Sequence, residues 1–141
     1  MLDVAVLALP YLANATDIDP LAAEAAVSVR LVGDVGRLGQ PDLVIIPGSK
    51  HTVHDLAWLR ARGFEPALRR LVAGGRTVVL GICGGYQALG TRIEDRVESG
   101  ASEVTGLGLL PVRTTFEADK VVRRATGEAL GERLDGYQLH H

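Results

Sequence analysis

Short aliphatic runs divide the first half of the chain into segments of strand length. Such runs occupy residues 4–9, 42–46 and 77–82, and each is followed or interrupted by Pro or Gly. Runs of this length are typical of buried strands rather than helices. Residues 27–32 instead alternate apolar and polar side chains, which is the pattern of a half-buried strand. The hydrophobic pattern therefore predicts four strands before residue 83.

Helical spacing of apolar residues appears between these strands. Residues 53–59 and 66–73 each place Leu or Val on one face, and glycines follow both segments. Residues 85–89 begin a third helix. Loops or turns are expected at residues 11–20 and 33–40, with a helical turn at 21–26. Continuous apolar strands alternating with helices predict an α/β fold, in which a mostly parallel sheet carries helices on both faces.

The pattern changes after residue 90, where glycines and polar residues interrupt every apolar run. Short strands separated by turns are expected at residues 107–112, 113–117 and 121–126. No internal repeat, low-complexity segment or linker divides the chain. Its 141 residues fit one domain, residues 1–141, built around one core.

Composition and charge narrow the possible partners. The chain carries 15 Lys and Arg against 17 Asp and Glu, a net charge of −2, and this gives no indication of a nucleic-acid or membrane partner. Cys83 is the single cysteine, so no disulfide can form within the chain. The N-terminus has no basic signal-peptide region, and no apolar run reaches membrane-spanning length. We expect a cytoplasmic protein.

Cys83 stands where a buried strand meets a helix, between Gly81 on one side and Gly84 and Gly85 on the other. This is the cysteine counterpart of the G-x-S-x-G nucleophile elbow, in which small neighbours permit a strained turn. The backbone N–H of Gly84 could then stabilise an oxyanion at the reacting centre. The alternatives are a buried structural cysteine, or a phosphate-binding loop, which lacks its usual Lys-Ser/Thr.

A second glycine-containing turn ends the neighbouring apolar strand. Pro47 and Gly48 should emerge at the same sheet edge as Cys83, where Gly48 could supply a second oxyanion donor. Pro-Gly after a strand can equally be a simple turn. His51 and His54 follow at a possible metal-ligand spacing, but no third ligand accompanies them, so no metal is assigned.

Six stretches together resemble the glutaminase domain of the cobyric acid synthase family, which are class I, triad-type glutamine amidotransferases. These stretches are residues 14–21, 41–52, 55–60, 81–90, 106–112 and 136–140. The resemblance runs almost from end to end and implies a class I, flavodoxin-like fold. The elbow would suit any class I glutaminase, whereas the Pro-Gly-Ser-Lys and Asp-Leu-Ala-Trp-Leu-Arg segments are more specific.

The resemblance implies that Cys83 attacks the carboxamide of L-glutamine, releases ammonia and forms a glutamyl thioester that water hydrolyses. Gln87 either helps to bind glutamine or only faces solvent. A synthetase domain, the implied partner, would use the ammonia with ATP and Mg²⁺ to amidate adenosylcobyrinic acid a,c-diamide in cobalamin biosynthesis. No cofactor is expected in the glutaminase domain itself.

Two departures from the family pattern qualify this expectation. The synthetase domain, which precedes the glutaminase in the family, is expected not to be part of these 141 residues. The family's general-base His lies in a later His-Gly segment, whereas His140 matches an earlier Gly-Tyr-x-x-His segment. The domain is therefore expected to be incomplete at its C-terminus, unless His140 or His141 replaces the base.

Two other functions remain open. The chain could be a catalytically incomplete module that binds a synthetase partner. It could also be the glutaminase of a related amidotransferase, either cobyrinic acid a,c-diamide synthase or the partner of a Mur-ligase-like protein.

Overall fold

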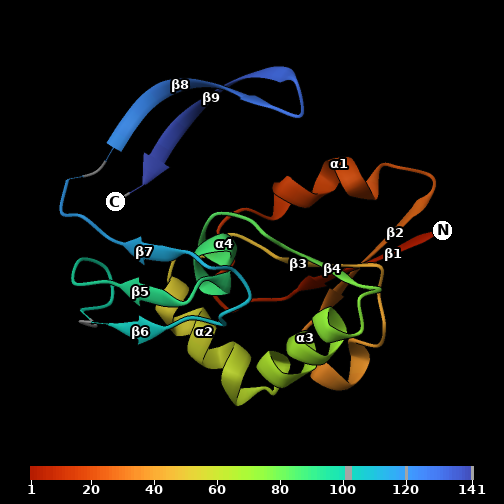
Figure 1. The fold of residues 1–141 in the computed structure, drawn as a ribbon. Helices are drawn as coiled ribbons and strands as arrows, with labels where there is room; N and C mark the ends of the chain where they lie inside the picture. The colour runs from red at the N-terminus through yellow and green to blue at the C-terminus, as the bar shows by residue number, and fades with distance from the viewer. Residues whose placement is uncertain (101–102, 120, 141) are drawn as a thin grey trace.

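A four-stranded parallel sheet forms the centre of the computed structural model, which describes residues 1–100, 103–119 and 121–140 (Figure 1). Its strand order is β2-β1-β3-β4. The strands are β1 (Leu2–Leu7), β2 (Val27–Val32), β3 (Leu43–Ile46) and β4 (Val78–Gly81). All four predicted strands are confirmed. The order reverses between β1 and β3, as in doubly wound folds, whose ligands generally bind beyond the carboxyl ends of the strands at such a reversal.

Apolar side chains on both faces of the sheet give the core two layers. Ala5 and Leu7 of β1 pack on one face, whereas Val4 and Val6 pack on the other. The same alternation runs along β3, where Ile45 points opposite to its neighbours. Both faces of the sheet are therefore buried against other elements at β1 and β3. Because a strand buried on both faces needs apolar side chains at every position, these two strands are largely continuous aliphatic runs.

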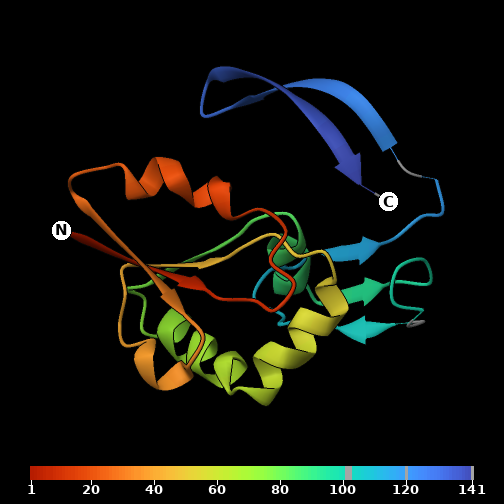
Figure 2. The same ribbon diagram turned by 180° about the vertical axis from the view of Figure 1, so that it is seen from behind.

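Helices cover both faces, as the alternation of elements predicts. One face carries α2 (Thr52–Ala61), α3 (Phe64–Ala73) and the 3₁₀ turn η2 (Val35–Arg37); the other carries η1 (Ala15–Ile18) and α1 (Asp19–Ala22) (Figures 1 and 2). The short α1 leaves much of its face open, so Leu31 of β2 is 66% exposed and Val78 of β4 is 64% exposed.

The boundary between α2 and α3 depends on Gly63, which adopts φ 77°. That left-handed conformation suits glycine and ends α2. Helix α3 then starts at Phe64, two residues before the predicted start, because Pro66 is tolerated in the first turn of a helix. Phe64 is fully buried and stacks on Trp58 with ring centroids 5.6 Å apart.

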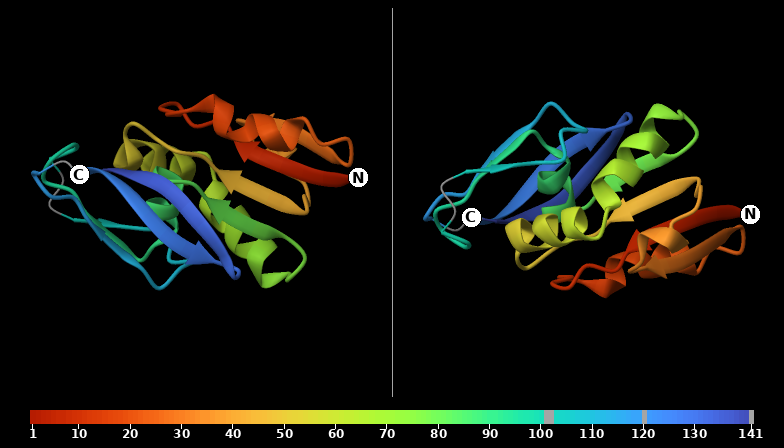
Figure 3. Two further views of the ribbon diagram at one scale, coloured as in Figure 1. Left: turned by 90° about the horizontal axis from the view of Figure 1, so that it is seen from above. Right: turned by 90° about the horizontal axis from the view of Figure 1, so that it is seen from below.

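The C-terminal half forms two further small sheets. Strands β5 (Arg92–Glu94), β6 (Val104–Thr105) and β7 (Arg113–Thr115) assemble in the order β6-β5-β7. Strands β8 (Val121–Ala129) and β9 (Glu132–His140) form a hairpin that stands apart from the central sheet in Figure 1 and lies across the other elements when seen from above in Figure 3. Leu130 and Gly131 both have positive φ, as the two-residue turn of a hairpin requires.

The structure corrects several predictions in this half and near the N-terminus. Residues 107–112 are not a strand, because their N–H groups bond the last carbonyls of helix α4 (Gly84–Leu89) and Gly90 instead of a neighbouring strand. Residues 11–20 are not only a loop, since they include η1 and the start of α1. The predicted strands at 113–117 and 121–126 are found as β7 and the longer β8. Strands β5, β6 and β9 were not predicted.

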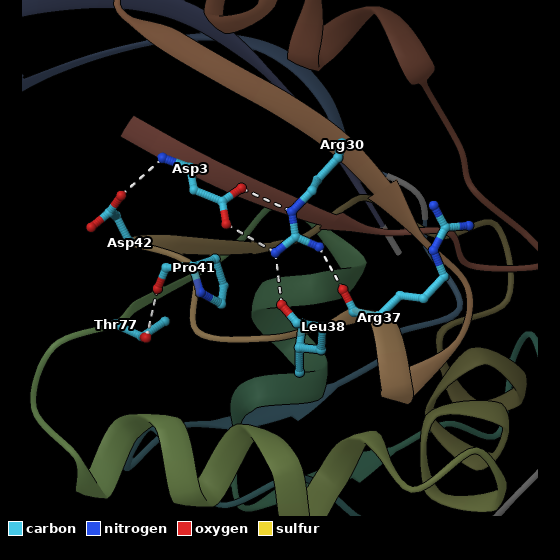
Figure 4. A network of polar contacts seen from close by, with 7 residues as sticks. All are labelled: Asp3, Arg30, Arg37, Leu38, Pro41, Asp42 and Thr77. Atoms are coloured by element: carbon cyan, nitrogen blue, oxygen red, sulfur yellow. Dashed lines mark hydrogen bonds and ion pairs between the residues drawn. The ribbon is translucent and has the colours of Figure 1, made fainter. Parts of the chain in front are cut away.

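A polar network ties the first three strands together at the amino edge of the sheet (Figure 4). The Arg30 guanidinium donates to both carboxylate oxygens of Asp3, at 2.8 and 3.0 Å, and also to the carbonyls of Arg37 and Leu38. This hydrogen bonding from Arg30, which outweighs the opposing effect of burial, holds the pKa of Asp3 below its ordinary value. Asp42 of the loop before β3 accepts from the Asp3 N–H at 2.8 Å.

No helix among the described residues is long and apolar enough to cross a membrane.

Truncating Leu59 tests the layer between α2 and the sheet. Leu59→Ala is expected to lower the free energy of unfolding by about 2–5 kcal/mol, because it leaves a cavity at a fully buried position. Leu31→Ala is the matched control, since the same atoms are removed at a 66% exposed position and the expected change is within about 0.5 kcal/mol. Urea denaturation measures both values. Equal losses in the two variants would contradict the assigned core.

The Asp3–Arg30 pair predicts a pH-dependent difference between wild type and Asp3→Asn. The folded-state pKa of Asp3 is lowered, so its contribution is complete above the unfolded pKa of about 3.9 and disappears as pH falls through the folded pKa. The difference should be at most about 1 kcal/mol at neutral pH, because the Asp3 side chain is 40% exposed. Glu24→Gln, at an exposed residue without an ion pair to the described chain, should show no such loss. Urea denaturation at a series of pH values measures the difference in the free energy of unfolding between each variant and the wild type.

Candidate functional site

Two turns meet at the carboxyl edge of the sheet because β3 and β4 are paired and parallel. Ile46 pairs with Gly81, the final residue of β4, and the Ile82 N–H donates to the Ile46 carbonyl at 3.0 Å. The turn of Gly48 therefore leaves β3 beside the turn of Cys83, as the sequence predicted from the two strand ends.

Cys83 occupies an unusual backbone conformation between β4 and α4. Its φ is 49° and its ψ is −110°, and its side chain is exposed. A residue with a β-carbon rarely holds a positive φ, and such strain clusters at functional sites. Two backbone hydrogen bonds close the turn, from Gly85 N–H to the Ile82 carbonyl at 2.8 Å and from Gln87 N–H to the Cys83 carbonyl at 3.1 Å. The backbone agrees with the strained turn expected of an elbow.

The buried glycines after Cys83 let this turn pack directly on the turn after β3. A β-carbon on Gly84 would lie 2.7 Å from Thr52 Oγ1 and 3.0 Å from the Ser49 nitrogen. A β-carbon on Gly85 would collide with the Ile46 carbonyl oxygen. Neither position can accept a side chain without displacing the backbone of the neighbouring segment.

Gly48 lies against Cys83. A β-carbon on Gly48 would sit 3.8 Å from Cys83 Cβ and 3.9 Å from the Ile82 carbonyl oxygen. Its own carbonyl accepts from the Ala13 N–H at 2.8 Å, whereas no other described group accepts from its N–H. The structure thus brings Gly48, Cys83 and Gly84 together, and the Gly48 N–H has no acceptor among the described residues.

Gln87 is half-buried and held by a residue that the sequence did not single out. Its Oε1 accepts from Thr52 Oγ1 at 3.1 Å, so the side chain is directed to the start of α2 rather than only to solvent. Thr52 is 5% exposed. Thr52 is the last residue of the 41–52 stretch of resemblance, but that stretch carried no signal of this contact, because Thr52 and Gln87 are 35 positions apart.

Two further polar residues of the site were also missed. Asp55 is 2% exposed, and its Oδ2 accepts from Ser49 Oγ at 2.6 Å. Ser49 directly follows Gly48, so this contact acts on the turn beside Cys83. The available signals were that Asp55 begins one stretch of family resemblance and that Ser49 belongs to the Pro-Gly-Ser-Lys segment, and neither signal assigns a role.

Asp95 is a second buried carboxylate, in the turn after β5. It accepts from the backbone N–H groups of Val97, Glu98 and Ser99 at 2.7 to 3.0 Å. Burial raises the pKa of Asp95, but the hydrogen bonds from Ser99, Glu98 and Val97 together hold it below the ordinary value. The carboxylate is thereby committed to its own turn.

His51 and His54 both contact the ring of Tyr11, with centroids 4.6 and 5.4 Å apart. Among the described residues, no group of three or more His, Cys, Asp or Glu could hold a metal ion. His141 lies outside the described residues, and of His140 only the backbone in β9 is described, so their suggested role as a base stays untested.

Known proteins are similar to this chain in sequence and in fold. It is 55% identical over 141 residues to cobyric acid synthase of Streptomyces avermitilis, which covers 100% of this chain and 28% of that protein. Cobyric acid synthase of Frankia casuarinae is 56% identical over 142 residues, with 100% of this chain and 27% of that protein covered. The chain therefore spans little more than a quarter of the length of these relatives.

A solved structure described as "Crystal structure of glutamine amidotransferase" superposes with a TM-score of 0.68, covering 97% of this chain and 69% of that one. The two sequences are 20% identical, so this likeness concerns the fold alone, and it agrees with the predicted class. Residues 3–141 match the CobB/CobQ-like glutamine amidotransferase domain. The strained cysteine turn packed on a glycine turn is thus found in a chain that belongs to the CobB/CobQ-like glutamine amidotransferase family.

Proposed function

We propose that this chain is the glutaminase part of a cobyric acid synthase, with Cys83 as its nucleophile. The observation that carries the proposal is the exposed Cys83 at φ 49°, packed beside Gly48 in a chain of this family. In the proposed reaction the Cys83 thiolate attacks the side-chain carbonyl carbon of glutamine and forms a tetrahedral oxyanion. The carbon–nitrogen bond then breaks, and the nitrogen leaves as ammonia after gaining a proton. Water attacks the remaining thioester, giving glutamate and the free thiol.

The two glycine turns supply the proposed oxyanion stabilisation. The Gly48 N–H has no acceptor in the described chain, and the Gly84 N–H lies in the first turn of α4, where helices leave their N–H groups without internal partners. Donors already aligned with the developing charge stabilise the transition state more than the substrate. One such donor is typically worth about 3 kcal/mol of activation free energy.

Gln87 is proposed to orient the side-chain carboxamide of the substrate glutamine near Cys83. It lies four residues after the nucleophile on the same short helix, and Thr52 fixes its side-chain oxygen. With that oxygen occupied, the amide NH₂ remains the group able to donate to a substrate oxygen.

The complete reaction belongs to the longer protein. By analogy with the relatives, we propose that the ammonia passes to a synthetase part that amidates adenosylcobyrinic acid a,c-diamide with ATP and Mg²⁺. The general base is proposed to be the His of a later His-Gly segment in that longer protein. If the 141-residue chain nevertheless released glutamate from glutamine, the alternative of a non-catalytic binding module would be excluded.

A glutamine-mimicking chloroketone is expected to alkylate Cys83 faster than iodoacetamide does, because its carbonyl can occupy the oxyanion position. Excess L-glutamine should slow both reactions, because glutamine bound at the proposed site covers the Cys83 thiol. Intact-mass spectrometry with peptide mapping follows both, and Cys83→Ser is the blank, since Cys83 is the only cysteine. Modification of the folded chain at other residues, with Cys83 untouched, would remove the basis of the proposal.

Gly84→Ala tests the contact between the two turns. The new methyl group would lie 2.7 Å from Thr52 Oγ1 and 3.0 Å from the Ser49 nitrogen, so the turn after β3 must move. The chloroketone rate at Cys83 should fall roughly tenfold or more, because small displacements of reacting groups are costly. Gly33→Ala is the control, because its new methyl group would meet Ala8 Cβ at 3.8 Å, which is an ordinary van der Waals distance. Similar rates in both variants would show that the packing does not matter.

A further inference from the structure

Asp55 is a buried carboxylate that the proposed chemistry does not use. It lies in the first turns of α2 with a relative exposure of 2%. Burying a charged group is costly unless hydrogen bonds compensate for lost water. Asp55 has two such bonds, from Ser49 Oγ at 2.6 Å to Oδ2 and from the Tyr11 N–H at 3.2 Å to Oδ1. Each oxygen therefore holds a different segment of the chain.

The two segments held by Asp55 are the ones that meet beside Gly48. Leu12 and Ser49 form an antiparallel bridge, flanked by bonds from Ala13 N–H to the Gly48 carbonyl and from Lys50 N–H to the Tyr11 carbonyl, both 2.8 Å. Ser49 Oγ donates to Asp55 and accepts from the His51 N–H at 2.9 Å. The hydroxyl thus links the turn to the start of α2, and its orientation is determined by both partners.

Ser49 in turn determines where Gly48 and Gly84 lie. It directly follows Gly48, whose α-carbon faces Cys83, and its nitrogen and β-carbon pack on Gly84. If Ser49 shifted, the Gly48 peptide would shift relative to the thiol. Displacements of about 1 Å at a reacting centre can cost roughly a hundredfold in rate.

We propose that Asp55 is a positioning residue, which acts through Ser49 to hold the Gly48 peptide at the distance from Cys83 that oxyanion stabilisation requires. The inference rests on the proposed glutaminase function and adds a residue to it. Within the described residues, both side-chain hydrogen bonds of Asp55 go to Tyr11 and Ser49, and neither goes to Cys83. This role also accounts for Asp55 at the start of the 55–60 stretch, which the reaction alone leaves without a function.

A purely structural role offers a competing explanation, because an acidic residue in the first turn stabilises a helix through its dipole. The two roles differ at Ser49. Ser49→Ala removes the hydrogen bond to Asp55 and leaves the charge on α2 in place. Asp55→Asn keeps the shape, but its single carbonyl oxygen cannot replace two acceptors, so an NH₂ group must face one of the two donors.

The test measures the rates at which Cys83 reacts with the glutamine-mimicking chloroketone and with iodoacetamide. Iodoacetamide needs no oxyanion donors, so the ratio of the two rates reports the position of the Gly48 turn. In Asp55→Asn and Ser49→Ala, the ratio should fall roughly tenfold or more, with the iodoacetamide rate within about twofold of wild type. The double variant should lose no more than the larger single loss, because both substitutions break the same link.

Asp95→Asn is the matched control, since it also removes a charge from a carboxylate that is 2% exposed and accepts several hydrogen bonds. Its ratio should stay within about twofold of wild type even if its melting temperature falls. A wild-type-like ratio in Ser49→Ala, or an equal fall in Asp95→Asn, would overturn the positioning role while the glutaminase proposal stands. Absence of chloroketone preference in the wild type would overturn both. Ser49→Ala decides the question if Asp55→Asn does not fold.

Discussion

The backbone conformation of Cys83 is the constraint on which the rest of the site depends. A residue with a β-carbon at φ 49° and ψ −110° is strained by about 1–3 kcal/mol, and it persists only where its surroundings leave no alternative. Here β4 enters the turn paired with β3, and Gly85 leaves it pressed against the Ile46 carbonyl. A relaxed turn would need space that β3 already occupies.

The doubly wound sheet supplies these surroundings. The connection from β1 to β2 and the one from β3 to β4 run in opposite directions, so the loops after β1 and β3 diverge around a shared edge. The Leu12–Ser49 bridge joins these two loops, and Cys83 follows the next strand along. The turn after β3 is thereby held between the loop after β1 and the turn of Cys83, although the three segments are distant in sequence.

The polar side chains around the site mainly hold loops in place, and the proposed reaction does not use them as reacting groups. Asp55 binds the loops after β1 and β3, and Asp95 organises the turn after β5. Arg60 donates to Glu65 at 2.8 Å and to the carbonyls of Thr105 and Gly106, which connects α2 to the segment that caps α4. A stretch such as 55–60 can therefore be highly recognisable without containing a reacting group, because its polar ends each hold a different part of the fold.

The sequence alone predicted those features whose signal lies within one short segment of the chain. Short apolar runs predicted the four parallel strands, and the continuity of these runs predicted helices on both faces of the sheet. The glycines around Cys83 predicted the nucleophile elbow. Each of these signals is contained in a few consecutive residues. The 107–112 segment was wrongly predicted for the opposite reason. Its composition is that of a strand, but its N–H groups find acceptors at the end of α4, which no local pattern reveals.

The contacts that assemble the site were decided only by tertiary structure. Tyr11 lies 44 positions from Asp55, and Thr52 lies 35 positions from Gln87, so neither pair has a sequence signature. The sequence by itself determined that a strained cysteine turn and a glycine turn share one sheet edge. Which side chains hold those turns in place depends on hydrogen-bond distances and burial, which exist only after the strands have paired and the helices have packed on them.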